Sequence, residues 1–103
     1  MAETRKNQHL AFSGSGTQTI AVDANEHISV FQVDVSVSTD TTIDIAIGAT
    51  SIFKGAIIAN SSPVQLFLYD FGKGRETGVK GDDLNVTMGE ASDVFIAYIK
   101  FSD

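Results

Sequence analysis

The sequence predicts an all-β fold, a single antiparallel β-sandwich of about eight strands and of jelly-roll type. Apolar and polar residues alternate with a period of two, and nowhere do they take the i, i+3, i+4 spacing of a helix. Valine, isoleucine, threonine and phenylalanine, which suit strands, are frequent. Clusters of glycine, serine, asparagine and aspartate separate the alternating segments at the intervals expected of a sandwich or barrel.

The chain is predicted to begin with an extended arm, residues 1–8, whose polar sequence MAETRKNQ indicates little order of its own. The sandwich then covers residues 9–103. Its predicted strands are residues 9–13, 18–23, 27–38, 41–47, 51–58, 64–71, 83–88 and 93–101. An immunoglobulin-like sandwich is the alternative, although the chain has neither the cysteine pair nor the core tryptophan of that fold.

Most of these strands show one apolar face and end at turn residues. Their apolar faces are formed by Ile20 and Val22, by Ile43, Ile45 and Ile47, and by Leu84, Val86 and Met88. Residues 51–58 run into the turn cluster Asn60-Ser61-Ser62-Pro63. One dry face and one wet face is the pattern of a sandwich strand.

The strand over residues 27–38 is the longest and changes the parity of its apolar residues midway. Phe31 and Val33 belong to one face, whereas Ile28 and Val30 belong to the other. A β-bulge would shift the register by one residue and bring both sets to the same side of the sheet. We therefore expect a bulge near Val30.

Two strands, residues 64–71 and 93–101, carry apolar residues on both faces. The surplus aromatic residues on them are Phe67, Tyr69, Phe71, Phe95 and Phe101. Together they offer several hundred Å² of apolar surface, which a monomer rarely leaves in water. Three interpretations stay open: the arm or a long loop covers the patch, a second subunit covers it, or it lines a ligand groove. The working prediction is an oligomer interface.

Composition excludes several classes of function. The 103 residues carry a formal net charge of −6, so polyanions are repelled and nucleic-acid binding is not expected. There is no cysteine, which excludes disulfides, thiolate metal sites and cysteine nucleophiles. No apolar run approaches the roughly 20 residues of a membrane-spanning helix. The polar start has no signal-peptide core, so we expect synthesis in the cytoplasm and no membrane partner.

No catalytic or metal-binding motif is found, and we expect neither an enzyme nor a cofactor. The two histidines, His9 and His27, have no HxH or HxxxH partner. The Walker phosphate loop and the G-x-S-x-G nucleophile elbow are absent. The acidic residues Asp82 and Asp83, with Asp93 or Glu90, are of the type that could gather around calcium. Ordinary acidic residues at strand ends are the simpler explanation, because the EF-hand pattern is missing.

Positive charge is concentrated in two segments that are predicted to be flexible. Five of the seven basic residues are Arg5 and Lys6 in the arm, and Lys73, Arg75 and Lys80 in the glycine-rich residues 72–81. A solvated loop explains the second group. The alternative, and the working prediction, is that arm and loop dock on an acidic neighbouring protein.

Residues 18–101 resemble the small β-sandwich structural proteins of tailed bacteriophages. The matching segments are TIAVDANEHISV, IDIAIGATSIFKGAIIANSSPVQL and GDDLNVTMGEASDVFIAYI. The G-D-x-L-x-V element, followed by a hydrophobic strand that reaches Tyr98, is the most specific part. Within this group the chain is similar to head decoration, or cement, proteins.

The resemblance implies a virion structural protein without catalytic residues. Such a protein sits on the outer surface of the capsid, binds the major capsid protein, stabilises the shell and often forms a homotrimer. Related sandwiches occur in phage tails and fibres, which is a second possibility. A carbohydrate- or receptor-binding module is a third, since such modules also use sandwich folds.

Overall fold

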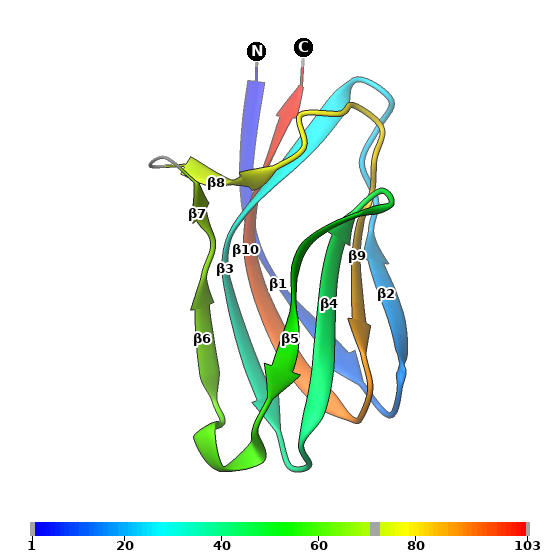
Figure 1. The fold of residues 1–103 in the computed structure, drawn as a ribbon. Helices are drawn as coiled ribbons and strands as arrows, with labels where there is room; N and C mark the ends of the chain where they lie inside the picture. Colours follow the sequence, from blue (N-terminus) through cyan, green and yellow to red (C-terminus); the bar gives the residue numbers. More distant parts are fainter. Residues whose placement is uncertain (1, 71–72, 103) are drawn as a thin grey trace.

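Two antiparallel sheets pack face to face in the structure, a computed structural model that describes residues 2–70 and 73–102 (Figure 1). Sheet A contains β1 (Ala2–Phe12), β3 (Glu26–Val37), β6 (Val64–Phe67), β7 (Tyr69–Asp70), β8 (Lys73–Glu76) and β10 (Ser92–Ser102). Sheet B contains β2 (Gly16–Ile20), β4 (Thr41–Ile47), β5 (Thr50–Ile57) and β9 (Leu84–Met88). The short 3-10 turn η1 (Ala59–Ser61) joins β5 to β6. Within the described ranges no helix has the length and apolar character of a membrane span.

The winding of the chain confirms the predicted antiparallel sandwich and its jelly-roll type. Sheet A has the order β1-β10-β3, and both β6 and β8 pair with β3 on its other side. Sheet B has the order β2-β9-β4-β5. The first four strands therefore alternate between the sheets, and β9 and β10 return between them, which is the double-sheet winding of a jelly roll.

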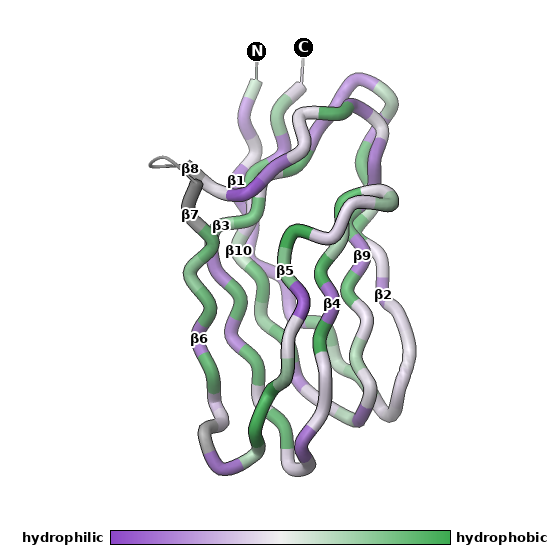
Figure 2. Tube along the Cα trace, viewed as in Figure 1, coloured by the Kyte–Doolittle hydropathy of each residue, from purple (hydrophilic) through white to green (hydrophobic). Residues whose placement is uncertain are grey.

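The core between the sheets is almost entirely aliphatic. Its side chains with less than 2% exposure are Ile28, Val30, Val33, Val35, Ile43, Ile45, Ile47, Leu84, Val86, Met88, Val94 and Ile96. They alternate with more polar residues, as the hydropathy colouring shows along β4 and β9 (Figure 2). Burial of these aliphatic side chains is the main force that holds the two sheets together.

The expected β-bulge is present in β3. Ala97 of β10 pairs with Gln32, and the next residue, Tyr98, pairs with Val30, so that Phe31 is the extra residue. The shift places Val30 and Val33 on the inner face, where both are fully buried. Alternation alone places Phe31 on the same face as Val33. The bulge instead turns Phe31 away from the core.

The prediction of an N-terminal arm is wrong for residues 2–8. They form the first part of β1, which pairs with β10 along its whole length, from Ala2 opposite Ser102 to Phe12 opposite Ser92. β1 is an edge strand, so nearly all its side chains stay exposed and only Leu10 and Phe12 enter the core. A polar strand of this kind lacks the apolar alternation by which strands are recognised.

The prediction that residues 72–81 are an exposed loop is also wrong in part, because β8 lies within them. Gly74 is buried against β3, and a β-carbon there would lie 2.5 Å from Ser29 Oγ and 2.8 Å from the Val30 carbonyl oxygen. Glycine therefore lets β8 approach β3 closely. The Arg75 guanidinium then reaches across to donate to the Ile52 carbonyl oxygen at 2.7 Å, which links β8 to β5.

Candidate interaction surface

The outer face of sheet A is built from cross-strand rows, because residues opposite each other in an antiparallel pair point to the same side. The first row is His9, Phe95, Asp34 and Gln65; the second is Asn7, Ala97, Gln32 and Phe67; the third is Arg5, Ile99, Ser29 and Glu76. Glu3, Phe101 and His27 form a fourth. In each row the residues come from β1, β10 and β3 in turn, and in the first three a residue of β6 or β8 follows.

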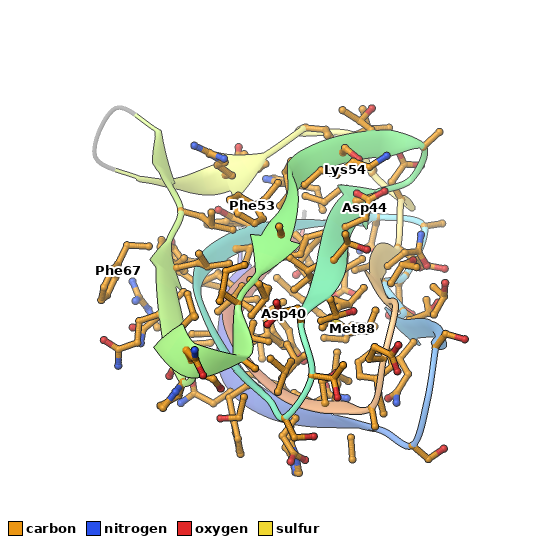
Figure 3. All side chains as sticks on the ribbon, turned by 60° about the horizontal axis from the view of Figure 1, so that its bottom comes forward. Asp40, Asp44, Phe53, Lys54, Phe67 and Met88 are labelled. Carbon is orange, nitrogen blue, oxygen red and sulfur yellow. The ribbon has the colours of Figure 1, made fainter. Side chains whose placement is uncertain are left out.

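Two large apolar side chains on this face are half exposed. Phe95 keeps 50% of its surface accessible and Phe67 keeps 56%. Phe67 projects away from the sandwich at β6 (Figure 3). Ala97 lies on β10, in the row of Phe67 and two residues along the strand from Phe95, and is much smaller than either ring, so the face is lower at this position. The face therefore presents apolar projections next to depressions.

Two depressions share Ala97 and Asn7. The Phe95 hollow, of about 320 Å³, is lined by Asn7, Gln32, Asp34, Phe95, Ile96 and Ala97. The Ile99 hollow, of about 400 Å³, is lined by Arg5, Lys6, Asn7, Phe31, Ala97, Tyr98 and Ile99. Both contain amide or charged side chains beside apolar ones. They are surface hollows and not enclosed cavities.

Phe95 is flanked by polar side chains of the first row and of the positions next to it. The His9 ring stacks on it at 4.4 Å between centroids with planes 9° apart. His9 Nε2 in turn lies 2.8 Å from Asp93 Oδ1. On the other side, Gln32 Nε2 donates to Asp34 Oδ1 at 3.1 Å. One side of the Phe95 ring is thus occupied by imidazole, and the Phe95 hollow lies toward Asp34.

The third row carries a small apolar cluster of its own. Ile99 is only 2% exposed, although it points away from the main core. Phe31 and Arg5 line the same hollow as Ile99, and the Arg5 guanidinium carbon lies 6.0 Å from the centroid of the Phe31 ring. Arg5 therefore leans across β10 toward β3, with its charge over an aromatic ring.

Three of the five predicted interface residues lie on this face. Phe67 and Phe95 are half exposed, and Phe101 is partly buried and stacks on His27 at 4.9 Å. Phe71 and the side chain of Tyr69 lie outside the described residues. The described chain places β1 beside these aromatic rings and not over them, so the covering-arm interpretation does not apply to Phe67 and Phe95. That they form an oligomer interface stays a prediction.

The predicted basic contact residues do not gather in one place. Arg5 lies on the outer face of sheet A, whereas Lys6 alternates to the other side of β1. Arg75 is turned toward sheet B by its hydrogen bond to Ile52, and Lys80 is exposed in the segment before β9. The side chain of Lys73 lies outside the described residues. Among the basic side chains that the structure describes, Arg5 is the one whose charge lies over an aromatic ring of this face.

Ile99, Phe31 and Ala97 belong to this surface but are not among the predicted interface residues. Ala97 and Ile99 have the same parity as Phe95 and Phe101, so strand alternation places them on this face. Phe31 required the exact position of the bulge. The hollow over Ala97 depends on its small size between larger neighbours, and its partners in the row follow only from the strand register.

The outer face of sheet B is polar by contrast. Thr17 and Thr87 Oγ1 lie 2.8 Å apart, and Thr19 Oγ1 donates to Asn85 Oδ1 at 2.7 Å. Asp44 and Lys54 are opposite each other on β4 and β5, and both point outward in Figure 3. Ser51 also donates a hydrogen bond to Asp44.

The acidic residues considered for calcium do not assemble. Asp82 and Asp83 precede β9, whereas Glu90 follows it, so the two groups lie at opposite ends of that strand. Asp83 accepts from the Val22 backbone at 2.9 Å, which ties it to a turn. Among the described residues no group of three or more potential ligands could hold a metal ion.

No protein-family model matches the chain, and no curated protein matches its sequence. Among solved structures, the insecticidal delta-endotoxin Cry8Ea1 from Bacillus thuringiensis is similar, with a TM-score of 0.50 and 18% identity. That alignment covers 89% of this chain and 19% of the endotoxin chain, so the chain spans about a fifth of that protein. At such identity the similarity concerns the β-sandwich fold alone.

Two virus particles are also among the similar structures. The extra small virus particle of the giant freshwater prawn Macrobrachium rosenbergii aligns with a TM-score of 0.48 and 11% identity, over 97% of this chain and 79% of that one. The VP2 subviral particle of infectious bursal disease virus aligns with a TM-score of 0.29 and 12% identity, over 95% and 32%. Neither is described as a tailed-phage decoration protein, so that resemblance stays a prediction.

Proposed function

We propose that the chain is a non-enzymatic structural component of a virus particle and that it works by binding other protein chains through the outer face of sheet A. The exposure of Phe95 and Phe67 on that face is the observation that carries the proposal. Large apolar patches on a protein surface mark sites of interaction. Aromatic residues are also the side chains that dominate the energetics of protein interfaces.

The more specific proposal is a capsid decoration protein on the outer surface of the shell, with the major capsid protein as its partner. It is supported by the sequence resemblance over residues 18–101 and by the jelly-roll winding, a fold that is common among viral capsid domains. Fold alone does not determine function, so the support comes from fold and surface together. The resemblance also implies three copies per unit, and the copy number is taken up in the next subsection.

A co-sedimentation experiment tests the proposal. The purified chain is mixed with shells assembled from the major capsid protein of the genome that encodes it. We expect the chain to pellet with the shells at a fixed stoichiometry, and the Phe95→Ser variant to bind at least about tenfold more weakly, because truncating a central aromatic anchor has effects of this size. The Thr87→Ser variant, changed on the outer face of sheet B, serves as the control. Absence of the wild-type chain from the pellet contradicts the proposal.

A carbohydrate-binding module is the second candidate, and the Phe95 hollow is the observation that favours it. Asn7, Gln32 and Asp34 offer amide and carboxylate groups beside an aromatic ring. Such planar polar groups hydrogen-bond sugar hydroxyls, and lectins also use the jelly roll. A glycan array tests this function: binding that is lost in the Asp34→Ala variant supports it, and an array without hits removes it.

A further inference from the structure

We propose that the outer face of sheet A pairs with the same face of a second copy of this chain, about a two-fold axis, so that Phe95 of each copy enters the Ile99 hollow of the other. The inference rests on the proposed function in one respect, the use of this face for protein binding, and it assigns the face to a second copy, so that the pair contacts the shell through other surfaces. Loss of Phe95 then weakens shell binding by separating the pair and halving the number of linked contacts. It commits to a symmetric pair and not to the trimer that the sequence resemblance implies.

The spacing of the rows makes the face self-complementary. The first and third rows lie on either side of the second, four residues apart along β10, which is about 13 Å. A two-fold axis that runs along the second row, in the plane between the copies, exchanges the first row with the third. Phe95 of one copy then faces Ile99 of the other, and the reverse contact is made at the same time, as symmetry requires.

The shapes of the two sites match. Phe95 is half exposed, and its ring stacks on the ring of His9. The Ile99 hollow, of about 400 Å³, has apolar walls from Phe31, Ala97 and Ile99. An aromatic side chain in such a hollow is the usual arrangement of an interface anchor and its pocket. Phe67 lies in the second row, on the axis itself, so the Phe67 side chains of the two copies face each other.

Charges favour the same arrangement. The Arg5 guanidinium, in the third row, leans toward Phe31 on β3, and Asp34 is on β3 in the first row. Exchange of the two rows therefore brings each guanidinium toward the carboxylate of the other copy, and the like charges stay apart. A two-fold axis parallel to the strands would instead set Phe95 against the other copy's Asp34, a less favourable contact.

The size of the face suits a small and weak dimer interface. The rows extend over seven residues of β1, from Glu3 to His9, and across four strands, which corresponds to roughly 23 by 19 Å. Pairing two such faces buries about 450 Å² per copy, below the standard size of specific protein interfaces and within the range of weak complexes. Both half-exposed phenylalanines of the described chain are covered in this pair.

Charge exchange between two variants tests the pairing. In the Arg5→Asp dimer, the new aspartate of each copy is directed toward Asp34 of the other copy, so both contacts are between acidic groups. In the Asp34→Arg dimer, both contacts are between basic groups. We expect each variant to dissociate about tenfold more readily than the wild type, because attraction between opposite charges is replaced by repulsion across roughly 10 Å, two strand spacings. An equimolar mixture of the two variants should restore the dimer, because both contacts are then attractive. Mass is measured by sedimentation equilibrium at low ionic strength.

Two controls keep the outcome clear. Thermal unfolding of each variant checks that both are folded, and the exposed Phe95→Ala variant gives an independent loss of the dimer without charge change. The Asp44→Lys and Lys54→Asp variants carry similar charge changes on sheet B and should leave the dimer intact.

A monomeric wild type, a trimer, or a mixture without dimer overturns the two-fold pairing. None of these results decides the proposed function, which stands or falls with shell binding.

Discussion

The two outer faces of the sandwich differ although the two sheets are built in the same way. Both sheets direct aliphatic residues inward at every second position. On the outer face of sheet B, hydroxyl and amide groups bond to one another, as Thr17 does to Thr87. On the outer face of sheet A, Phe95 and Phe67 remain half exposed, and Ile99 is buried but is not a member of the main core cluster. The outward positions, and not the core, therefore distinguish the two sheets, and they are the basis of the proposed binding surface.

The largest expected effect is on the free energy of unfolding, and it compares Ile99, which is buried on the outer face of sheet A, with Thr87 on the outer face of sheet B. Ile99→Ala removes a side chain that is 2% exposed, and we expect a loss of about 2–4 kcal/mol in the free energy of unfolding. Thr87→Ala should cost less than about 1 kcal/mol, because Thr87 is exposed. Urea unfolding at low protein concentration measures both. Equal effects would remove the distinction between the two faces.

The next effect concerns association and not stability. Phe95→Ser should weaken self-association about 10- to 100-fold, since it removes an aromatic anchor. The same change should alter the free energy of unfolding of the monomer by less than about 1.5 kcal/mol, because half of the ring is already exposed and chiefly the His9 stack is lost. Sedimentation and urea unfolding give the two numbers. If Phe95→Ser greatly lowered the free energy of unfolding and left self-association unchanged, Phe95 would be a structural residue and not part of the interface.

The smallest expected effect is a dependence of stability on alkaline pH, and it comes from Tyr98 on the inner side of the β1–β10 pair. Burial raises the pKa of the Tyr98 phenol above its ordinary value, and the hydroxyl donates to Gln8 Oε1 at 3.1 Å. Its raised pKa contributes stability that is present below the pKa of the unfolded chain, near 10. That contribution is lost as pH rises through the folded pKa. Stability should thus fall at alkaline pH, and less steeply in Tyr98→Phe. Identical pH profiles would contradict this.

The fold could be predicted from the sequence because alternation and turn residues are local signals. The bulge near Val30 followed from a change of parity, and its presence is confirmed. The N-terminal strand could not be predicted, since an edge strand of polar residues is stabilised by backbone pairing with β10 and leaves no apolar pattern. β8 was missed for a related reason: its glycine fits a close approach to Ser29 that only the folded chain reveals.

The candidate surface was predictable in part. The surplus aromatic residues of β6 and β10 pointed to Phe67 and Phe95, and both are half exposed on one face. The hollows beside them depend on which residues the register places in the same row, and sequence alone does not give the register of distant strands. For the same reason the sequence does not show that Arg5 lies over Phe31 or that Arg75 is turned toward sheet B.

Protection of a single thiol tests most directly whether the outer face of sheet A is covered by another chain. The protein has no cysteine, so Ala97→Cys and Thr87→Cys each introduce one thiol, on the outer faces of sheet A and sheet B. We predict that the rate of maleimide labelling of the Ala97→Cys variant falls at least tenfold as protein concentration rises, because at roughly 90% dimer only about a tenth of the chains expose the thiol. The labelling rate of the Thr87→Cys variant should not change. A rate for Ala97→Cys that does not depend on concentration would contradict the covered face.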